Sequence, residues 1–508
     1  MGSLQDTRST EVSSPLGDDV LLLRRMTASE ELGRPFEFEL QLLSEDHDIE
    51  LGEVLGEHLS VRLDLPNDRQ RYFDGLVTSF AHVGVSRSHA VYHATLRPWP
   101  WLLAHAANCR IFQDKTVPDI VKEVFRDHGF SDFEERLSET YRTWEYCVQY
   151  RETDFDFVSR LLEREGIYYF FEHDKAKHTL VLADSYSAHA PADGYGSVPY
   201  RPPDDAIVDE REIVHDWRVE KRVQSSTYVS SDFDFEKPRS KLEVKATIER
   251  QDQAPELEVY DYPGAYSEKG AGESLSKVRI EELQARYERA FGCTNARGLA
   301  AGRLFELEDH PRGDQNREYL IVAAVNEVEA NGFESGGGGT KAVLSCRFEA
   351  LDSREAFRAE RTTPRPVVRG PQTAVVTGKS GEEIWTDEYG RVKVKFHWDR
   401  AGKGDETSSC WVRVAQFWAG KKFGGLCIPR IGQEVIVEFL EGDPDRPIVT
   451  GAVYNGDHMP PFALPGDATQ SGIRTRSSKD GAEKSGNEIR FENQTPGCRF
   501  TLSLPRAG

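Results

Sequence analysis

Long apolar runs are missing from this sequence, and so is a secretion signal. No apolar run reaches the roughly 18 residues that a membrane-spanning helix needs, so we expect no stable membrane insertion. The first residues, MGSLQDTRSTEVSSPLGDD, lack the apolar core of a signal peptide. If the protein leaves the cell, we expect that it does so without a conventional cleaved signal.

Cysteine pairs and a net basic charge are missing as well. The seven cysteines are odd in number and form no CxxC pair, which argues against a disulfide framework and against a zinc knuckle. We expect buried free thiols in a reducing cytoplasm. The net charge is −22, whereas a polyanion-binding protein normally carries the opposite sign. Bulk nucleic-acid binding is therefore disfavoured.

Familiar catalytic patterns are absent too. We find no GxSxG and no HExxH, and the run 336–339 of four glycines lacks the Lys-Ser/Thr of a phosphate loop, so it predicts a flexible hairpin loop. His173 and His178, in FEHDKAKH, are a possible metal pair across a hairpin, but we favour a solvated turn. The 86 acidic residues leave a glycosidase-type carboxylate pair open, since none is singled out. We expect no enzyme, no catalytic residue, no cofactor and no metal.

Strand patterns dominate what is present. The composition, with 38% hydrophobic and 30% charged residues, is typical of a globular chain, and 508 residues predict about three domains. In FEFELQLLSE, four apolar side chains alternate with polar ones, which predicts a half-buried strand. The segments IYYFFEH and HTLVLADS predict a hairpin across DKAK.

The sequence predicts helices at three places. Thr116 and Thr153 each precede an apolar stripe and have an aspartate three residues later, which predicts two capped helices. Gly129 and Gly166 are the predicted ends of these helices. The segment ESLSKVRIEELQARYERAFG predicts a third helix that ends near Gly292.

A small barrel is predicted in the last third of the chain. The stiff, proline-rich segment RTTPRPVVRGP, residues 361–371, is the best domain boundary. Five short strands with turn signals follow it, which predicts a closed or nearly closed barrel. They are QTAVVTG, RVKVKFHW, CWVRVAQ, QEVIVEFLEG and PIVTGAVYN.

The stretch TDEYGRVKVKFHWDR, residues 386–400, holds the densest cluster of reactive side chains. On a regular strand its inward residues are Val392, Val394, Phe396 and Trp398. Its outward residues are Arg391, Lys393, Lys395, His397 and Asp399. His397 and Asp399 would then lie about 7 Å apart, too far for the hydrogen bond that a base and its orienting carboxylate need. We therefore expect a barrel wall rather than an active site.

The outward row Arg391, Lys393, Lys395 and His397 is our candidate for contacts with a neighbouring subunit or domain, with plain solvated surface as the alternative. Residues 369–446 contain 12 basic and 12 acidic residues, so the barrel has no net charge. A balanced surface suits protein contacts better than a phosphate track.

Long stretches of the chain resemble VgrG, the spike protein family of the bacterial type VI secretion system. The resemblance runs from about residue 16 to about residue 490 and is carried by nearly continuous motifs. They are LRPWPWLL (96–103), CRIFQD (109–114), EYCVQYRETDFDFVSRLLEREGIYYFFEH (145–173), GPQTAVVTGKSGEEIWTDEYGRVKVKFHWDR (370–400), SSCWVRVAQFWAG (408–420) and PRIGQEVIVEFLEGDPDRPIVTGAVYN (429–455).

The resemblance implies a mainly β fold with some helices, similar to the hub and spike of contractile phage tails. It assigns residues 1–365 to a tail-hub-like region with two barrel-like subdomains and residues 366–460 to an OB-fold barrel. Residues 461–508 become a neck and an atypical short tail. It further implies a homotrimer, because two similar barrels in each of three chains give six equivalent surfaces for the hexameric Hcp tube. Assembly in the cytoplasm, secretion through the type VI system and effector delivery are implied as well.

The end of the sequence departs from the family pattern. GNEIRFEN is followed by QTPGCRFTLSLPRAG instead of a long, valine-rich β-helix region. We therefore expect a C-terminally truncated form that lacks the needle, which puts binding of the tip protein PAAR in doubt.

Two other functions compete with the structural one. The first is a peptidoglycan hydrolase, as some phage spikes carry, although only about 50 polar residues follow residue 456, too few for a usual domain. The second is an OB-type nucleic-acid binder.

Overall fold

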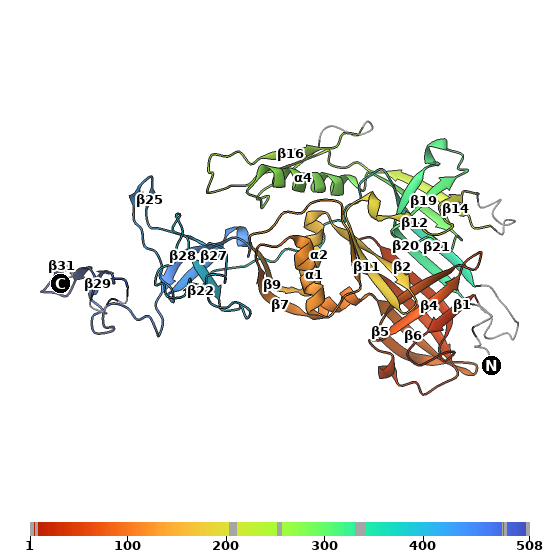
Figure 1. Cartoon of the computed structure of the whole chain (residues 1–508), viewed down its shortest axis with the longest axis horizontal. Helices are drawn as coiled ribbons and strands as arrows, with labels where there is room; N and C mark the ends of the chain where they lie inside the picture. The colour runs from red at the N-terminus through yellow and green to blue at the C-terminus, as the bar shows by residue number, and fades with distance from the viewer. Residues whose placement is uncertain are drawn as a thin grey trace. The chain divides into compact units, whose positions relative to one another are not determined.

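The chain folds into two compact units that are both built mainly from strands (Figure 1). The computed structural model describes residues 5, 9–202, 211–250, 257–330, 342–479, 481 and 485–503, so the glycine run 336–339 lies outside the described residues. The first unit comprises Met1–Ala107, Thr116–Arg142 and Thr153–Pro364, and the second comprises Asn108–Lys115, Thr143–Glu152 and Arg365–Gly508. In the part of the chain that the structure describes, no helix is long and apolar enough to cross a membrane.

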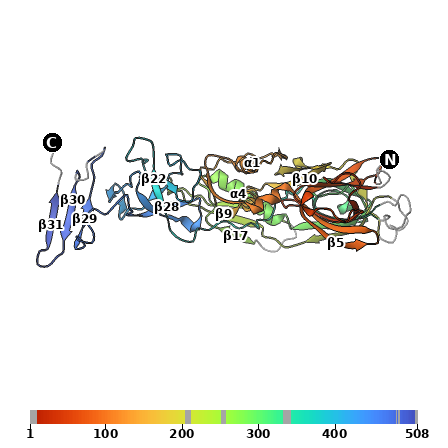
Figure 2. The same ribbon diagram turned by 90° about the horizontal axis from the view of Figure 1, so that it is seen from below.

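A large antiparallel sheet organises the first unit, in the strand order β1-β4-β5-β6-β3-β2-β20-β21-β18-β14. Figure 2 shows the strands around β5 curving into a ring. β19 (Arg303–Glu308) pairs with β20 and carries β12 (Ala190–Pro191) and β13 (Ser197–Pro199). The main strands are β1 (Thr10–Ser13), β2 (Leu22–Glu31), β3 (Glu37–Ser44), β4 (His58–Asp64), β5 (Gln70–Ser86), β6 (His89–Arg97), β14 (Val214–Lys221), β18 (Glu288–Thr294), β20 (Glu318–Glu329) and β21 (Val343–Asp352).

The half-buried strand predicted from FEFELQLLSE is confirmed as β3. Phe38, Leu40 and Leu42 are buried, whereas Glu39 between them is exposed. The ring of Phe36, just before the strand, stacks on Phe38 with centroids 4.3 Å apart. Alternation therefore places the apolar face of β3 in the core.

Both capped helices are confirmed. α1 (Val117–Asp127) and α2 (Asp154–Glu165) lie side by side in Figure 1. The hydroxyl oxygen of Thr153 accepts a hydrogen bond of 3.0 Å from the Asp156 amide at the start of α2. Gly166 ends α2 with a φ of 74°, a conformation that glycine adopts without strain.

The third predicted helix is confirmed as a helix, but it begins at Lys269 rather than at Glu273, and its predicted end is wrong. α4 is Lys269–Gln284, and the residues after it turn into β18 instead of continuing to Gly292. β18 pairs with β14 on one side and with β21 on the other, so its backbone N–H and C=O groups form hydrogen bonds within the sheet. Figure 1 shows α4 beside β16 (Val244–Thr247), which forms a small sheet with β15 (Thr227–Ser230) and β17 (Glu258–Asp261).

The predicted hairpin is also confirmed. β10 (Tyr168–Asp174) pairs with β11 (Lys177–Ala183) across a turn of two exposed residues, and β8 (Phe133–Arg136) runs parallel to β11. The hairpin is part of the first unit, where it packs against β5.

The second unit contains the five-stranded barrel that the strand spacing predicted. Its strand order is β23-β22-β27-β28-β24. The strands are β22 (Gln372–Thr377), β23 (Lys393–Phe396), β24 (Arg413–Val414), β27 (Glu434–Phe439) and β28 (Pro447–Val453). Its core is mostly valine, with Val376, Val394 and Val435 each almost completely buried. β-branched residues pack well on such a pleated wall.

Two segments from early in the sequence, Asn108–Lys115 and Thr143–Glu152, belong to the barrel unit. A single division of the chain at residue 365 would assign both to the first unit. β7 (Ala107–Phe112) pairs with β9 (Cys147–Thr153). Val148 of β9 joins the buried core of the barrel, and its amide donates a hydrogen bond of 2.6 Å to Oδ1 of Asp445. The second unit therefore draws its core from residues about 300 positions apart in sequence.

Candidate functional site

The predicted contact row lies on the barrel wall, but two of its cations already have partners there. The Nε atom of Arg391 donates to Oδ2 of Asp387 at 2.6 Å. The ammonium of Lys393 donates to the carbonyl of Ser409 at 2.7 Å, and burial lowers the pKa of Lys393. The hydrogen bonds of these two side chains are therefore made within the barrel and not with another molecule.

The other two members of the row, Lys395 and His397, are more available for contacts with another subunit or domain. Lys395 is half-buried, and no hydrogen bond or ion pair of its ammonium is seen within the described residues. His397 is exposed, and its Nε2 atom lies 3.1 Å from the hydroxyl of Thr373. Lys395 and His397 therefore remain the candidates for contact with a neighbouring subunit or domain.

The predicted alternation holds for His397 and Trp398 but fails at Asp399, because β23 ends at Phe396 and the chain turns. The prediction that Asp399 faces outward is wrong: its side chain is buried, and Oδ1 accepts hydrogen bonds from the amides of Ala401 and Gly402 at 3.1 and 2.9 Å. Trp398 packs against the barrel core as predicted, stacking on Phe396 with ring centroids 5.0 Å apart. Asp399 is thus a turn residue and not a partner of His397.

An exposed aromatic loop extends from the barrel unit at residues 417–426, which we call the aromatic arm. It contains a two-stranded ribbon, β25 (Ala419–Gly420) and β26 (Phe423–Gly424), and its base is closed where the Cys427 amide donates to Oε1 of Gln416 at 2.8 Å. Four large apolar side chains stand in solvent, Phe417 (82% exposed), Trp418 (59%), Phe423 (61%) and Leu426 (72%). Such a cluster is typical of an interaction surface.

A second apolar surface lies on a three-stranded antiparallel sheet that we call the tail sheet (Figure 2). It consists of β29 (Gln470–Arg474), β30 (Glu488–Glu492) and β31 (Arg499–Ser503). The register aligns Ile489 with Ile473 on one side and with Leu502 on the other, and Phe491 with Phe500. Alternate residues of a strand share a face, so all five lie on one face, and each is at least 39% exposed.

The opposite face of the tail sheet is charged. Glu488 pairs there with Arg474 at 2.6 Å and with Arg490 at 3.2 Å. The sheet is therefore amphipathic, with one charged face and one apolar face. We had expected only a polar neck and an atypical tail in this region, because the apolar residues are too widely spaced in sequence to stand out.

The histidines that we assigned to a solvated turn are buried, so that prediction is wrong. The exposed turn is Lys175–Ala176, whereas the side chain of His173 is 7% exposed and that of His178 is fully buried. Nδ1 of His178 lies 2.8 Å from Oδ2 of Asp74, and Nδ1 of His58 lies 2.9 Å from the same oxygen. Because the partners come from β4 and β5, over 100 residues earlier, the local sequence gave no sign of them.

The buried carboxylate sets the protonation of this cluster. Burial alone would raise the pKa of Asp74, but hydrogen bonds from His178, His58 and Ser60 outweigh it and lower that pKa to about 2. The hydrogen bond to Asp74 raises the pKa of His58. Burial lowers the pKa of His178, so its ring is neutral near pH 7.

The same three residues have the donor types of a metal site, with ligand atoms within 4.8 Å of one another. The backbone amide of Trp99, however, donates to Nε2 of His178 at 3.0 Å. A neutral ring has one proton, so it must sit on Nδ1, the atom that faces Asp74. A metal at Nδ1 would require an imidazolate, so this geometry suits a hydrogen-bonded anchor better than a metal centre.

Comparison with known proteins agrees with this picture of hub and barrel. Residues 29–332 match the family described as phage tail baseplate hub (GPD), and residues 374–454 match the type VI secretion system/phage-baseplate injector OB domain. The type VI secretion system spike protein VgrG1a of Pseudomonas aeruginosa is 52% identical over 493 residues, which cover 97% of this chain and 76% of that protein. The chain belongs to the VgrG spike protein family.

Other VgrG proteins extend further than this chain. VgrG1b of Pseudomonas aeruginosa is 53% identical over 496 residues, covering 97% of this chain and 66% of that protein, so the chain spans about two-thirds of its length. The actin cross-linking toxin VgrG1 of Vibrio cholerae is 34% identical, covering 94% of this chain but only 44% of that protein.

The solved structure of the Escherichia coli c3393 protein, a type VI secretion component similar to the T4 phage tail proteins gp27 and gp5, shares the fold. The TM-score is 0.61 at 22% sequence identity, covering 87% of this chain and all of that one. The contact row and the aromatic arm lie inside the VgrG region that matches the OB domain, whereas the tail sheet lies beyond it.

Proposed function

We propose that this chain is a structural, non-enzymatic component of a type VI secretion spike. It forms the hub and OB barrel of a homotrimer that links the hexameric Hcp tube to the spike tip and aids effector delivery. It assembles in the cytoplasm and leaves the cell through the secretion system itself. Membership of the VgrG family supports this role and the number of three chains, and the uncovered apolar face of the tail sheet carries the proposal that copies of the chain associate.

An uncovered apolar face is costly in water. A small sheet gains its stability by covering one apolar face, and within the chain this face stays exposed. Copies of the same chain supply the missing cover, because each brings an identical surface of aligned isoleucine, leucine and phenylalanine. The ion pairs of the opposite face can then stay in solvent. Closed rotational symmetry is the usual arrangement for such self-association.

Light scattering after size-exclusion chromatography tests the trimer. We expect three times the 57.4 kDa mass of one chain. Phe500→Ser on the apolar face should shift the protein toward monomer, whereas Arg499→Ser, one residue away on the opposite face, should leave the mass unchanged. A wild-type protein that stays monomeric, or equal effects of both variants, would refute this surface as the subunit contact.

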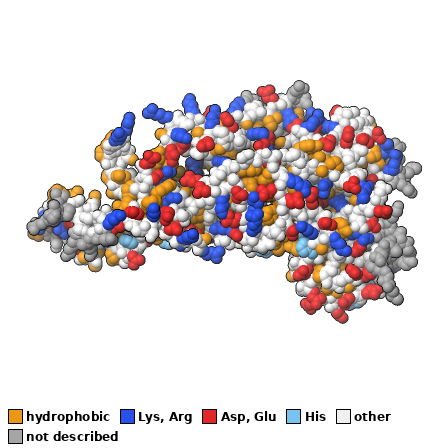
Figure 3. Space-filling view, viewed as in Figure 1, with side chains coloured by type: hydrophobic (Ala, Val, Ile, Leu, Met, Phe, Trp, Pro, Cys, Tyr) orange, Lys and Arg blue, Asp and Glu red, His pale blue; other side chains and the backbone are white. Residues whose placement is uncertain are grey.

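The two alternative functions lack support. Lysine and arginine side chains are interspersed with acidic ones on the face drawn in Figure 3, which does not favour a phosphate track. A gel shift that survives physiological salt would revive a nucleic-acid binder. Clearing of cell-wall material in a zymogram would revive a peptidoglycan hydrolase.

A further inference from the structure

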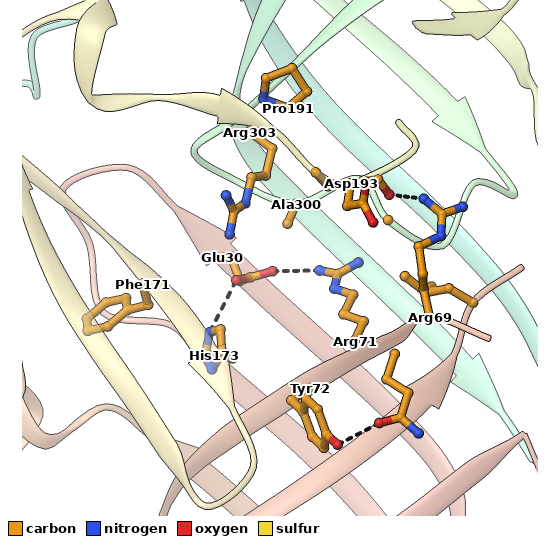
Figure 4. A pocket seen from close by; sticks show the side chains of 14 residues that line it. Glu30, Arg69, Arg71, Tyr72, Phe171, His173, Pro191, Asp193, Ala300 and Arg303 are labelled. Carbon is orange, nitrogen blue, oxygen red and sulfur yellow. Dashed lines mark hydrogen bonds and ion pairs between the residues drawn. The ribbon is translucent and has the colours of Figure 1, made fainter. Parts of the chain in front are cut away.

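A cavity of about 340 Å³ opens in the first unit, well away in sequence from the OB barrel. Its walls are the turn between β4 and β5, the loop after β12 and the chain leading into β19 (Figure 4). β2 and β10 add one side chain each to its polar floor, Glu30 and His173. Five separate stretches of the chain thus converge on one polar space.

Glu30 is buried on the floor of this cavity and is surrounded by positive or protonatable groups. Nη2 of Arg71 lies 3.1 Å from one oxygen of Glu30, and Nε2 of His173 lies 3.5 Å from the other. Arg303 points toward the same carboxylate in Figure 4. Burial raises the pKa of Glu30, but His173 and the charges of Arg71 and Arg303 outweigh this and lower it, so Glu30 is ionised.

Positive charge remains after Glu30 is counted. The cavity is lined by three guanidinium groups, those of Arg69, Arg71 and Arg303, and by two carboxylates, those of Glu30 and Asp193, which leaves an excess of one positive charge. This excess is notable in a chain whose net charge is −22, because most of its surface should repel anions.

Several donors on the cavity wall lack an acceptor. Within the described residues the guanidinium of Arg303 makes no hydrogen bond, and its nearest ion-pair oxygen, on Glu172, is 3.5 Å away. Nε2 of His173 is buried, and its nearest partner is the Glu30 oxygen at 3.5 Å, beyond the usual hydrogen-bond distance. Arg69 donates from Nε to the carbonyl of Pro66 and from Nη1 to the carbonyl of Asp193, which holds its guanidinium at the rim. Guanidinium groups with spare donors are suited to planar or tetrahedral oxyanions.

We propose that this cavity is a binding site for a small oxyanion, either a carboxylate or a phosphate group, held by Arg303 and Arg69. The ligand would accept the hydrogen bonds that Arg303 does not use and would balance the excess positive charge. It would also tie the β4–β5 turn to β19, so that binding stabilises the folded first unit. The proposal depends only on the first unit and not on the trimer.

Calorimetric titration of the full chain with phosphate and, separately, with malonate tests the site and distinguishes the two chemistries. Sodium chloride of matched ionic strength controls for screening. We expect saturable binding of at least one anion and a rise in melting temperature that chloride does not reproduce. Arg303→Gln should weaken binding at least about tenfold. Arg312→Gln, an exposed arginine paired with Asp314, should bind like wild type.

No saturable heat with either anion, or unchanged affinity in Arg303→Gln, would overturn the proposal. If Arg303→Gln does not fold by circular dichroism, Arg69→Gln at the rim takes its place, and unchanged affinity there counts equally against the site.

Discussion

The backbone amide of Trp99 donates a hydrogen bond of 3.0 Å to Nε2 of His178. This contact places the ring proton on Nδ1, from which His178 donates to Asp74. The 3-10 helix that begins at Trp99 is thereby joined through one imidazole to β5 and β11. We conclude that the buried histidine cluster is an anchor inside the hub.

Replacing Asp74 with asparagine should change the acid stability of the protein. The folded pKa of about 2 lies below the unfolded value of 3.8, so the contribution of Asp74 is present above pH 3.8 and is lost as the pH falls through 2. We expect Asp74→Asn to lower the free energy of unfolding at pH 7 by about 2 kcal/mol. Its stability should then fall less steeply than that of wild type between about pH 4 and pH 2.

Urea unfolding at several pH values measures this effect. The exposed residue Asp18 provides the control, since Asp18→Asn should follow the wild-type pH profile. An Asp74→Asn profile as steep as that of wild type would show that Asp74 is not the group that titrates.

Zinc should not bind at the histidine cluster. Nδ1 of His178 carries its only proton toward Asp74, so no lone pair is available there for a metal. We expect titration calorimetry with zinc to give the same isotherm for wild type and for His178→Gln, and EDTA to leave the wild-type melting temperature unchanged. A one-to-one zinc site that disappears in His178→Gln would contradict the proton assignment.

The two lysines of β23 should differ in their effect on stability. Lys393→Gln removes the hydrogen bond to the Ser409 carbonyl and should lower the free energy of unfolding by about 1 kcal/mol. Lys395→Gln should change it by less than about 0.5 kcal/mol, since the described residues show no bond from its ammonium. Thermal unfolding followed by tryptophan fluorescence compares them, and equal losses would refute the distinction.

The cap of α2 provides a local test of the hub. Thr153→Ala removes the acceptor of the Asp156 amide, and we expect a loss of about 1 kcal/mol in the free energy of unfolding. Thr140→Ala, at an exposed position outside any helix or strand, should have little effect. If both variants unfold alike in urea, the hydroxyl of Thr153 does not stabilise the helix.

Local features of the fold were predictable because their causes are local. The caps at Thr116 and Thr153 need only a hydroxyl and an amide three residues later, and the alternation in β3 needs only a period of two. The end of α4 was not predictable in this way. Residues 288–294 fit a helix or a strand locally, and pairing with β14 and β21 decided in favour of the strand.

The candidate site was predicted only in part. The sequence placed Arg391, Lys393, Lys395 and His397 on a barrel wall. It did not show that Arg391 is hydrogen-bonded to Asp387 or that Lys393 is hydrogen-bonded to the Ser409 carbonyl. The aromatic arm and the apolar face of the tail sheet escaped prediction, because exposure depends on what the rest of the chain leaves uncovered.

By itself, the sequence determined the period of the strands, the starts of the two capped helices, the presence of short strands in the last third and the family. The strand period and the helix caps depend on residues close together in the chain, and the family was identified from continuous motifs. Only the tertiary structure decided that His178 is buried against Asp74, that Val148 joins the barrel core and that Arg303 faces a cavity beside Glu30. The physical reason is that burial, and the pairing of buried charges, are set by partners that lie more than a hundred residues away.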